Sequence, residues 1–178
     1  MHFVDALYLV FVTLALCAVY VALLDFFPRF FAQEGVTSRR NRFLPLFGII
    51  AFSAMAYAMS YSLSDQEFSN RVLHIFGGGF AGFLTCFLAV RNSGVRIRKL
   101  QLFVVSVLIV LALGTAHELL EFFLQTYAGI MSATTITDTW LDLTSNVVGM
   151  LLASACLVPF HKEVEQSTLA RTPSLPLC

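Results

Sequence analysis

Five apolar stretches constrain the fold of this 178-residue chain more than any other feature. Each is about as long as the roughly 17 to 25 residues that a helix needs to cross a bilayer. Only 12% of the residues are charged, against about 25% in a typical soluble domain. We therefore predict an all-α, multi-pass membrane protein whose five transmembrane helices lie near 4–24, 44–63, 72–90, 100–126 and 138–160. The polar tail 161–178 is expected to be disordered.

The positive charges predict an orientation. Ten of the eleven Lys and Arg residues fall in the first connection, the third connection and the tail, which share one side if the chain alternates through five spans. The positive-inside rule makes that side cytoplasmic, so the N-terminus is predicted outside and the C-terminus inside. We expect the plasma membrane as the location. The formal net charge of zero gives no indication of a nucleic-acid partner.

The opposite, extracytoplasmic side is acidic, and its carboxylates extend into the apolar helices. In the 100–126 stretch, His117, Glu118 and Glu121 share one helical face. Counted from the outer end, Glu121 lies roughly 8 Å and Glu118 roughly 12 Å deep. Ionisable groups at such depths are rare in membrane helices and indicate a functional site.

The next stretch, 138–160, carries a matching face with Asp138, Asp142 and Asn146. The short connection predicts antiparallel neighbours. If the two faces meet, Glu121 is expected level with Asp142, and Glu118 level with Asn146.

The 72–90 stretch begins on the same side, with Arg71 and His74 on a face that continues through Gly78 and Gly82. Small residues four apart let two helices approach closely. This approach should bring Arg71 and His74 to the acids. The 44–63 stretch adds serines and Tyr57 at the same depth, so the polar stripes of four helices are predicted to converge.

An Asp at a helix centre in a membrane costs about 2.5 to 3.5 kcal/mol, and clustered carboxylates also repel one another. A divalent metal ion would compensate, because Mg²⁺, Ca²⁺ and Mn²⁺ prefer oxygen ligands and histidine also admits Zn²⁺. The predicted metal ligands are His117, Glu118, Glu121, Asp138 and Asp142. Acid–base roles are predicted for Glu118, Glu121, Asp142 and His74, and substrate-binding roles for Arg71, His74 and Asn146.

Structural explanations exist for several of these residues. Asp138 suits the first turn of a helix, where a carboxylate interacts favourably with the helix dipole. His74 and Asn146 are able to serve as hydrogen-bonding contacts between helices. The sequence His117-Glu118-Leu119-Leu120-Glu121 contains half of a zinc-protease motif, with glutamate in place of its second histidine, and is a weak signal by itself.

These residues resemble a known family. The run from His117 to Glu121, followed by Asp138-xxx-Asp142-xxx-Asn146-xx-Gly149, is similar to the C-terminal motif of VanZ-like and YjdF-like membrane proteins. The segment Arg71-Val-Leu-His74 resembles their basic-xx-His motif. VanZ-type members carry a glutamine and a basic residue before the Asp run, and 127–137 contains neither, so the YjdF-like branch is the closer match. The resemblance implies a role in the cell envelope, where the family's named member is associated with glycopeptide resistance.

Three functions remain open at this stage. The leading hypothesis is a site, with or without enzymatic activity, that binds or acts on a lipid-linked or headgroup component of the envelope. The second is a proton- or cation-coupled transporter that uses the same carboxylates. The third is a non-catalytic assembly subunit, in which the acids bond neighbouring helices.

Overall fold

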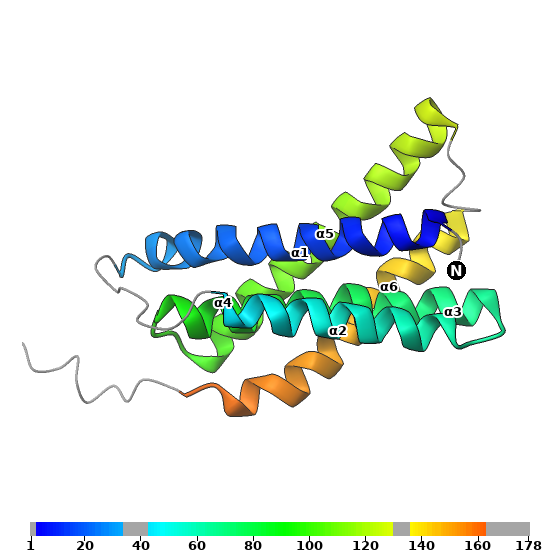
Figure 1. Cartoon of the computed structure of the whole chain (residues 1–178). Helices are drawn as coiled ribbons and strands as arrows, with labels where there is room; N and C mark the ends of the chain where they lie inside the picture. The colour runs from blue at the N-terminus through cyan, green and yellow to red at the C-terminus, as the bar shows by residue number, and fades with distance from the viewer. Residues whose placement is uncertain (1–2, 34–42, 130–135, 163–178) are drawn as a thin grey trace, which may run out of the picture.

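A computed structural model describes residues 3–33, 43–129 and 136–162, and it confirms the all-α fold (Figure 1). Five helices are long and apolar enough to cross a membrane, as predicted. The elements are α1 (Phe3–Phe30), α2 (Leu44–Tyr61), α3 (Gln66–Leu73), η1 (His74–Phe80), α4 (Ala81–Ser93), α5 (Lys99–Ala128), α6 (Ile136–Leu157) and η2 (Val158–Phe160). Elements α3, η1 and α4 join end to end into one span.

The first and third spans differ most from the predicted ranges. The first helix continues past residue 24 to Phe30, with Pro28 in its last turn. The third begins at Gln66, six residues before the expected start, because the Asp65 side chain accepts a hydrogen bond from the Phe68 amide (3.0 Å) and caps the helix. The expected tail beyond residue 162 and the centre of the connection 127–137 lie outside the described residues.

The third span is the centre of the bundle. In its most apolar stretch, 56% of the residues are buried, compared with 17% in the corresponding stretches of α1 and α5. Element η1 packs on α6, and α4 packs on α1. A buried hydrogen bond from Asn92 Nδ2 to the Tyr20 hydroxyl (2.7 Å) joins α4 to α1. Residues on the third span therefore face every other helix of the described bundle.

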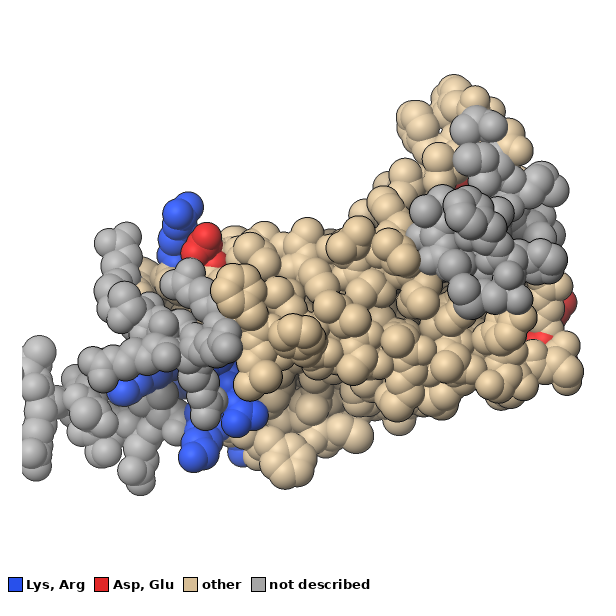
Figure 2. Space-filling view, viewed as in Figure 1, with Lys and Arg blue, Asp and Glu red and all other residues tan. Residues whose placement is uncertain are grey.

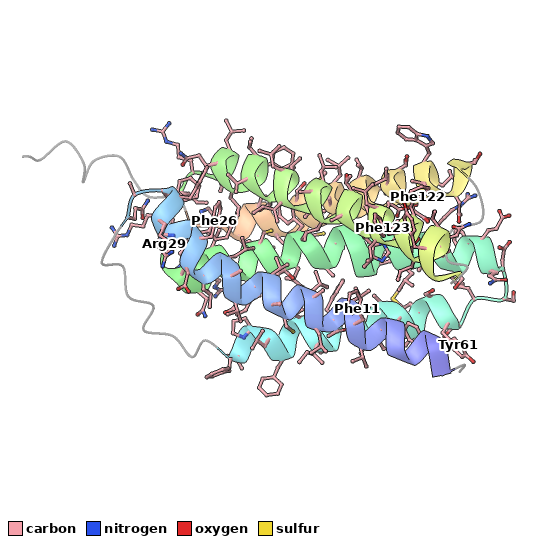
Figure 3. All side chains as sticks on the ribbon, turned by 90° about the horizontal axis from the view of Figure 1, so that it is seen from above. Phe11, Phe26, Arg29, Tyr61, Phe122 and Phe123 are labelled. Atoms are coloured by element: carbon pink, nitrogen blue, oxygen red, sulfur yellow. The ribbon has the colours of Figure 1, made fainter. Side chains whose placement is uncertain are left out.

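The two ends of the bundle differ in charge. Figure 2 shows Lys and Arg side chains gathered at one end, beside one acidic group, further Asp and Glu side chains at the other end, and a broad uncharged band between them. Arg29 marks the basic end, whereas Tyr61, Phe122 and Phe123 lie toward the other end (Figure 3). At the basic end Gln33 exchanges two hydrogen bonds with the Arg96 backbone, both 2.9 Å long. The uncharged band is the segment that lies in hydrocarbon.

The orientation in the membrane stays a prediction, which impermeant thiol labelling on whole cells tests directly. In a chain whose cysteines are replaced by serine, we expect Glu67→Cys to be labelled from outside because it is exposed in the first turn of the third span, at the acidic end of the bundle. We expect Arg96→Cys at the basic end to react only after lysis. The reverse pattern would show that the N-terminus is cytoplasmic.

Candidate functional site

The site is built around η1, a π-helical turn that contains Gly77, Gly78 and Gly79. π-Helical turns are rare and often lie at functional sites. The backbone of α6 lies directly against this turn. A Cβ atom at Gly149 would overlap the carbonyl oxygen of Ile75, and one at Gly79 would overlap the carbonyl oxygen of Asn146. This backbone contact places the polar face of α6 beside His74.

Asp142 is the innermost acid of that face and is 4% exposed. His74 Nε2 lies 3.4 Å from Asp142 Oδ2. The Asn70 amide donates to both carboxylate oxygens, at 3.0 and 3.2 Å. Three residues from the third span and α6 thus meet at one carboxylate.

Asn70 is a residue of the site that the sequence alone does not predict. The predicted helix started at residue 72, so Asn70 was assigned to a connection. In the structure it lies on α3, four residues before His74 and therefore on the same helical face. The signal that would have found it is Asp65, a helix-capping residue followed by the acidic Glu67 in the first turn.

Replacing Asn70 with leucine is expected to weaken divalent-metal binding at this site by about 10- to 100-fold, the usual cost of losing a partner that orients a metal ligand. The Asp142 carboxylate would lose both hydrogen bonds from the Asn70 amide and become free to rotate. The measurement is Mn²⁺ or Zn²⁺ affinity of the purified protein. Gln66→Leu removes an exposed amide one turn away and should leave that affinity unchanged. Equal affinity in the two variants would contradict an orienting role for Asn70.

Glu118, on α5, is 7% exposed, and neither of its side-chain oxygens has a hydrogen-bond partner among the described residues. It forms a long ion pair with His117, whose Nδ1 lies 3.9 Å from Glu118 Oε1. Buried polar atoms without hydrogen bonds are unusual because they lose solvation without replacement. Glu118 therefore needs another partner.

Five residues, which we call the His/carboxylate cluster, surround this position as two overlapping triads. In each triad, one ligand atom per residue lies within 4.8 Å of the other two. The first triad is His74, Glu118 and Asp142, and all three residues are buried; the second is His117, Glu118 and Glu121, and only Glu118 is fully buried. Histidine nitrogens and carboxylate oxygens at this spacing are suitable ligands for a divalent metal ion. Glu118 belongs to both triads.

The second triad opens toward the outer end of α5. His117 Nε2 lies 3.8 Å from Glu121 Oε1, and the two side chains are 22% and 14% exposed. The rings of His74 and His117 meet nearly edge to face, with centroids 5.9 Å apart. The two histidines therefore connect the buried triad to the more accessible one.

Three further predicted site residues lie around the cluster. Asn146 is buried against Gly78 and Gly114, and its Oδ1 has no hydrogen-bond partner among the described residues. Asp138 is partly exposed, one turn before Asp142, and belongs to neither triad. Arg71 forms an exposed ion pair with Glu67 (3.7 Å) instead of meeting the buried acids, so its predicted position beside them is wrong. The reason is the early helix start, which places Glu67 one turn before Arg71.

The predicted pairing of depths is wrong by one turn. Glu118, rather than Glu121, is level with Asp142, and Gly114 is the α5 residue that meets Asn146. In Figure 1 the C-terminal half of α5 leans away from the rest of the bundle. Residues counted along a leaning helix do not convert directly into depth in the bundle.

Beyond the cluster, toward the basic end, the described core is mostly apolar, and its buried polar residues, such as Thr85, Asn92 and Ser106, are neutral. Phe83, Val110, Met150 and Ala153 fill the space between α4, α5 and α6. No described ionisable side chain is buried among them. The polar site is therefore confined to the acidic half of the bundle.

Residues 43–163 match the family described as "Predicted membrane protein (DUF2238)". The match covers more than half of the chain and all residues of the His/carboxylate cluster, so the chain belongs to this family. It is a multi-pass membrane protein that resides in a lipid bilayer. No curated protein and no solved structure matches it.

Proposed function

We propose that the His/carboxylate cluster binds a divalent metal ion and that the site binds or acts on the headgroup of a lipid-linked component of the cell envelope. The observation that carries the proposal is Glu118, a buried carboxylate without a hydrogen-bond partner among the described residues, shared by two triads of metal-ligand type. The resemblance to VanZ-like and YjdF-like proteins supports the envelope setting and a location in the plasma membrane.

The ligand set fits a cation because the carboxylates of Glu118 and Asp142 lie close together beside His74, and those of Glu118 and Glu121 lie close together beside His117. Arg71, the nearest predicted compensating charge, pairs with Glu67. A metal ion would supply the Glu118 oxygens with a direct bond, whereas the described residues offer them only the long ion pair with His117. Two histidines with three carboxylates favour Mn²⁺ or Zn²⁺ over an ion that takes oxygen ligands alone.

Each residue then has a role. His74, Glu118 and Asp142 would hold the ion, which polarises a phosphoryl or carbonyl oxygen of the headgroup. His117 and Glu121, which are more accessible, would accept or donate the proton at the reacting group. Asn146 would orient the headgroup through its free oxygen, and Arg71 would attract an anionic headgroup to the outer end of the site.

The proposal is tested with purified protein in detergent. We expect at least one Mn²⁺ or Zn²⁺ ion per chain to bind in calorimetry and to be released by a chelator. Binding no greater than that of a detergent blank would contradict the proposal. A cation flux in liposomes, abolished by Asp142→Asn, would favour the transporter instead; the apolar core beyond the cluster makes us expect no flux.

A further inference from the structure

An apolar groove of about 270 Å³ lies beside the cluster, between α1 and α5. Helix α1 packs on α2 and α4, and within the described residues its backbone does not come close to that of α5. The outer half of α5 projects away from the body of the molecule (Figures 1 and 2). The two helices thus form the sides of an opening whose floor is the third span.

Most of the groove is lined by apolar side chains, and polar side chains line one end of it. Its walls include Phe11, Val12 and Ala15 from α1 and Leu113 and Ala116 from α5. The polar residues that line it are His74, His117, Asn146, Ser53 and Tyr57. Its volume is close to the lower end of ligand pockets, roughly 300 to 1,000 Å³.

The opening faces the hydrocarbon of the bilayer rather than water. Phe11, Ala15 and Ala116 are exposed on spans that cross the membrane. An apolar cavity stays free of water and accepts apolar guests. The material that surrounds this opening is lipid, so a lipid chain can enter sideways without leaving the hydrocarbon.

An occupant must also suit the polar end, where His74 and His117 belong to the proposed metal site. A molecule with one flexible hydrocarbon chain and an anionic phosphate headgroup meets both conditions. Its phosphate would reach the ion and the two histidines while its chain lies along α1 and α5. Membrane phospholipids have this chemistry and are present at the opening.

We infer that the groove between α1 and α5 binds one acyl chain of a phospholipid whose phosphate lies at the His/carboxylate cluster, and that this lipid enters sideways from the bilayer. The inference rests on the proposed function for the role of the headgroup. The apolar groove itself does not depend on a metal ion.

The test uses vesicles that contain phosphatidylglycerol with a photoreactive diazirine in one acyl chain. After illumination, we expect mass spectrometry to find the probe concentrated on peptides with groove residues of α1 and α5. Labelling spread evenly over all lipid-facing helices would overturn the inference. Strong labelling by an isoprenyl phosphate probe, but not by phosphatidylglycerol, would show that the occupant is not an acyl chain.

The second part of the labelling experiment compares matched variants. Ala15→Trp fills the groove from α1 and Ala116→Trp from α5, and each should lower groove labelling by about tenfold, equivalent to about 1.4 kcal/mol. Ala22→Trp and Ala112→Trp alter exposed alanines of the same helices outside the groove lining and should change nothing. Unchanged labelling in both groove variants would overturn the inference.

Metal affinity separates the two proposals. Because Ala15 and Ala116 are not in the cluster, their variants should bind Mn²⁺ like the wild type, which also shows that they fold. Specific groove labelling in a wild-type chain that binds no metal would refute the proposed function but support acyl-chain binding in the groove. Metal binding together with labelling spread evenly over the helices would refute the acyl-chain inference and support the proposed function.

Discussion

Replacing Glu118 with glutamine is expected to lower divalent-metal affinity by at least about 100-fold, because the loss of a ligand should exceed the 10- to 100-fold cost of losing an outer partner. Glutamine keeps the size of the side chain and removes its negative charge. Glu118 belongs to both triads, so the change affects every arrangement of ligands in the cluster. The measurement is calorimetric titration of purified protein with Mn²⁺ or Zn²⁺.

Two substitutions of the same kind serve as controls. Glu121→Gln alters only the second triad and should have a smaller effect than Glu118→Gln. Glu67→Gln alters an exposed carboxylate, 89% accessible, that pairs with Arg71 and should leave metal affinity unchanged. The ligand assignment would be wrong if Glu118→Gln bound metal as tightly as Glu67→Gln.

The Glu118 variant should also remain folded. Because the carboxylate has no hydrogen-bond partner among the described residues, a neutral amide in its place removes a buried charge without breaking such a bond. We therefore expect the metal-free variant to melt no lower than the metal-free wild type. A large loss of stability would indicate that the Glu118 charge serves the fold rather than a ligand.

Replacing Gly149 with alanine is expected to destabilise the protein by about 3 kcal/mol, the upper range for overpacking a core. The added methyl group would overlap the Ile75 carbonyl oxygen, a backbone atom that a rotamer change cannot move. At the size of this chain, the melting temperature should fall by about 6 to 12 °C. In a chain whose other cysteines are replaced by serine, the reaction of buried Cys86 with a thiol dye during heating reports the transition.

Gly48 provides the matched control because a Cβ atom there meets nothing within 4 Å. Alanine is favoured over glycine inside a helix by about 1 kcal/mol, so Gly48→Ala should melt at the wild-type temperature or slightly above it. Equal melting temperatures for the two variants would contradict the close contact of η1 with α6. That contact holds Asp142 beside His74, so Gly149→Ala should weaken metal binding as well.

The membrane fold could be predicted because it depends on the lengths of the apolar stretches. The convergence of the polar faces of the third span, α5 and α6 was also predictable, since polar residues on otherwise apolar helices mark the faces that turn toward each other. The match of Glu118 with Asp142 was not, because the expected partner of Asp142 was Glu121. Gly78 contributed as expected, because it lies against Asn146. These predictions needed only helical periodicity and the alternation of spans across the bilayer.

Other features of the site depend on the packing of the helices, which cannot be derived from helical periodicity. The early start of α3 brings Asn70 to Asp142 and pairs Arg71 with Glu67. The π-helical turn at η1 changes the phase of the third span after His74. The lean of α5 shifts its register against α6 by one turn and opens the groove beside α1 (Figure 1). Each of these arises from packing between helices rather than from one helix alone.

The most direct test of the metal site is a crystal structure of the protein soaked with Mn²⁺, with anomalous scattering used to locate the ion. The account predicts an anomalous peak about 2.0 to 2.2 Å from a Glu118 carboxylate oxygen. The other ligands should come from His74 and Asp142, from His117 and Glu121, or from both pairs. A well-ordered cluster with no anomalous peak near Glu118 at saturating Mn²⁺ would contradict it.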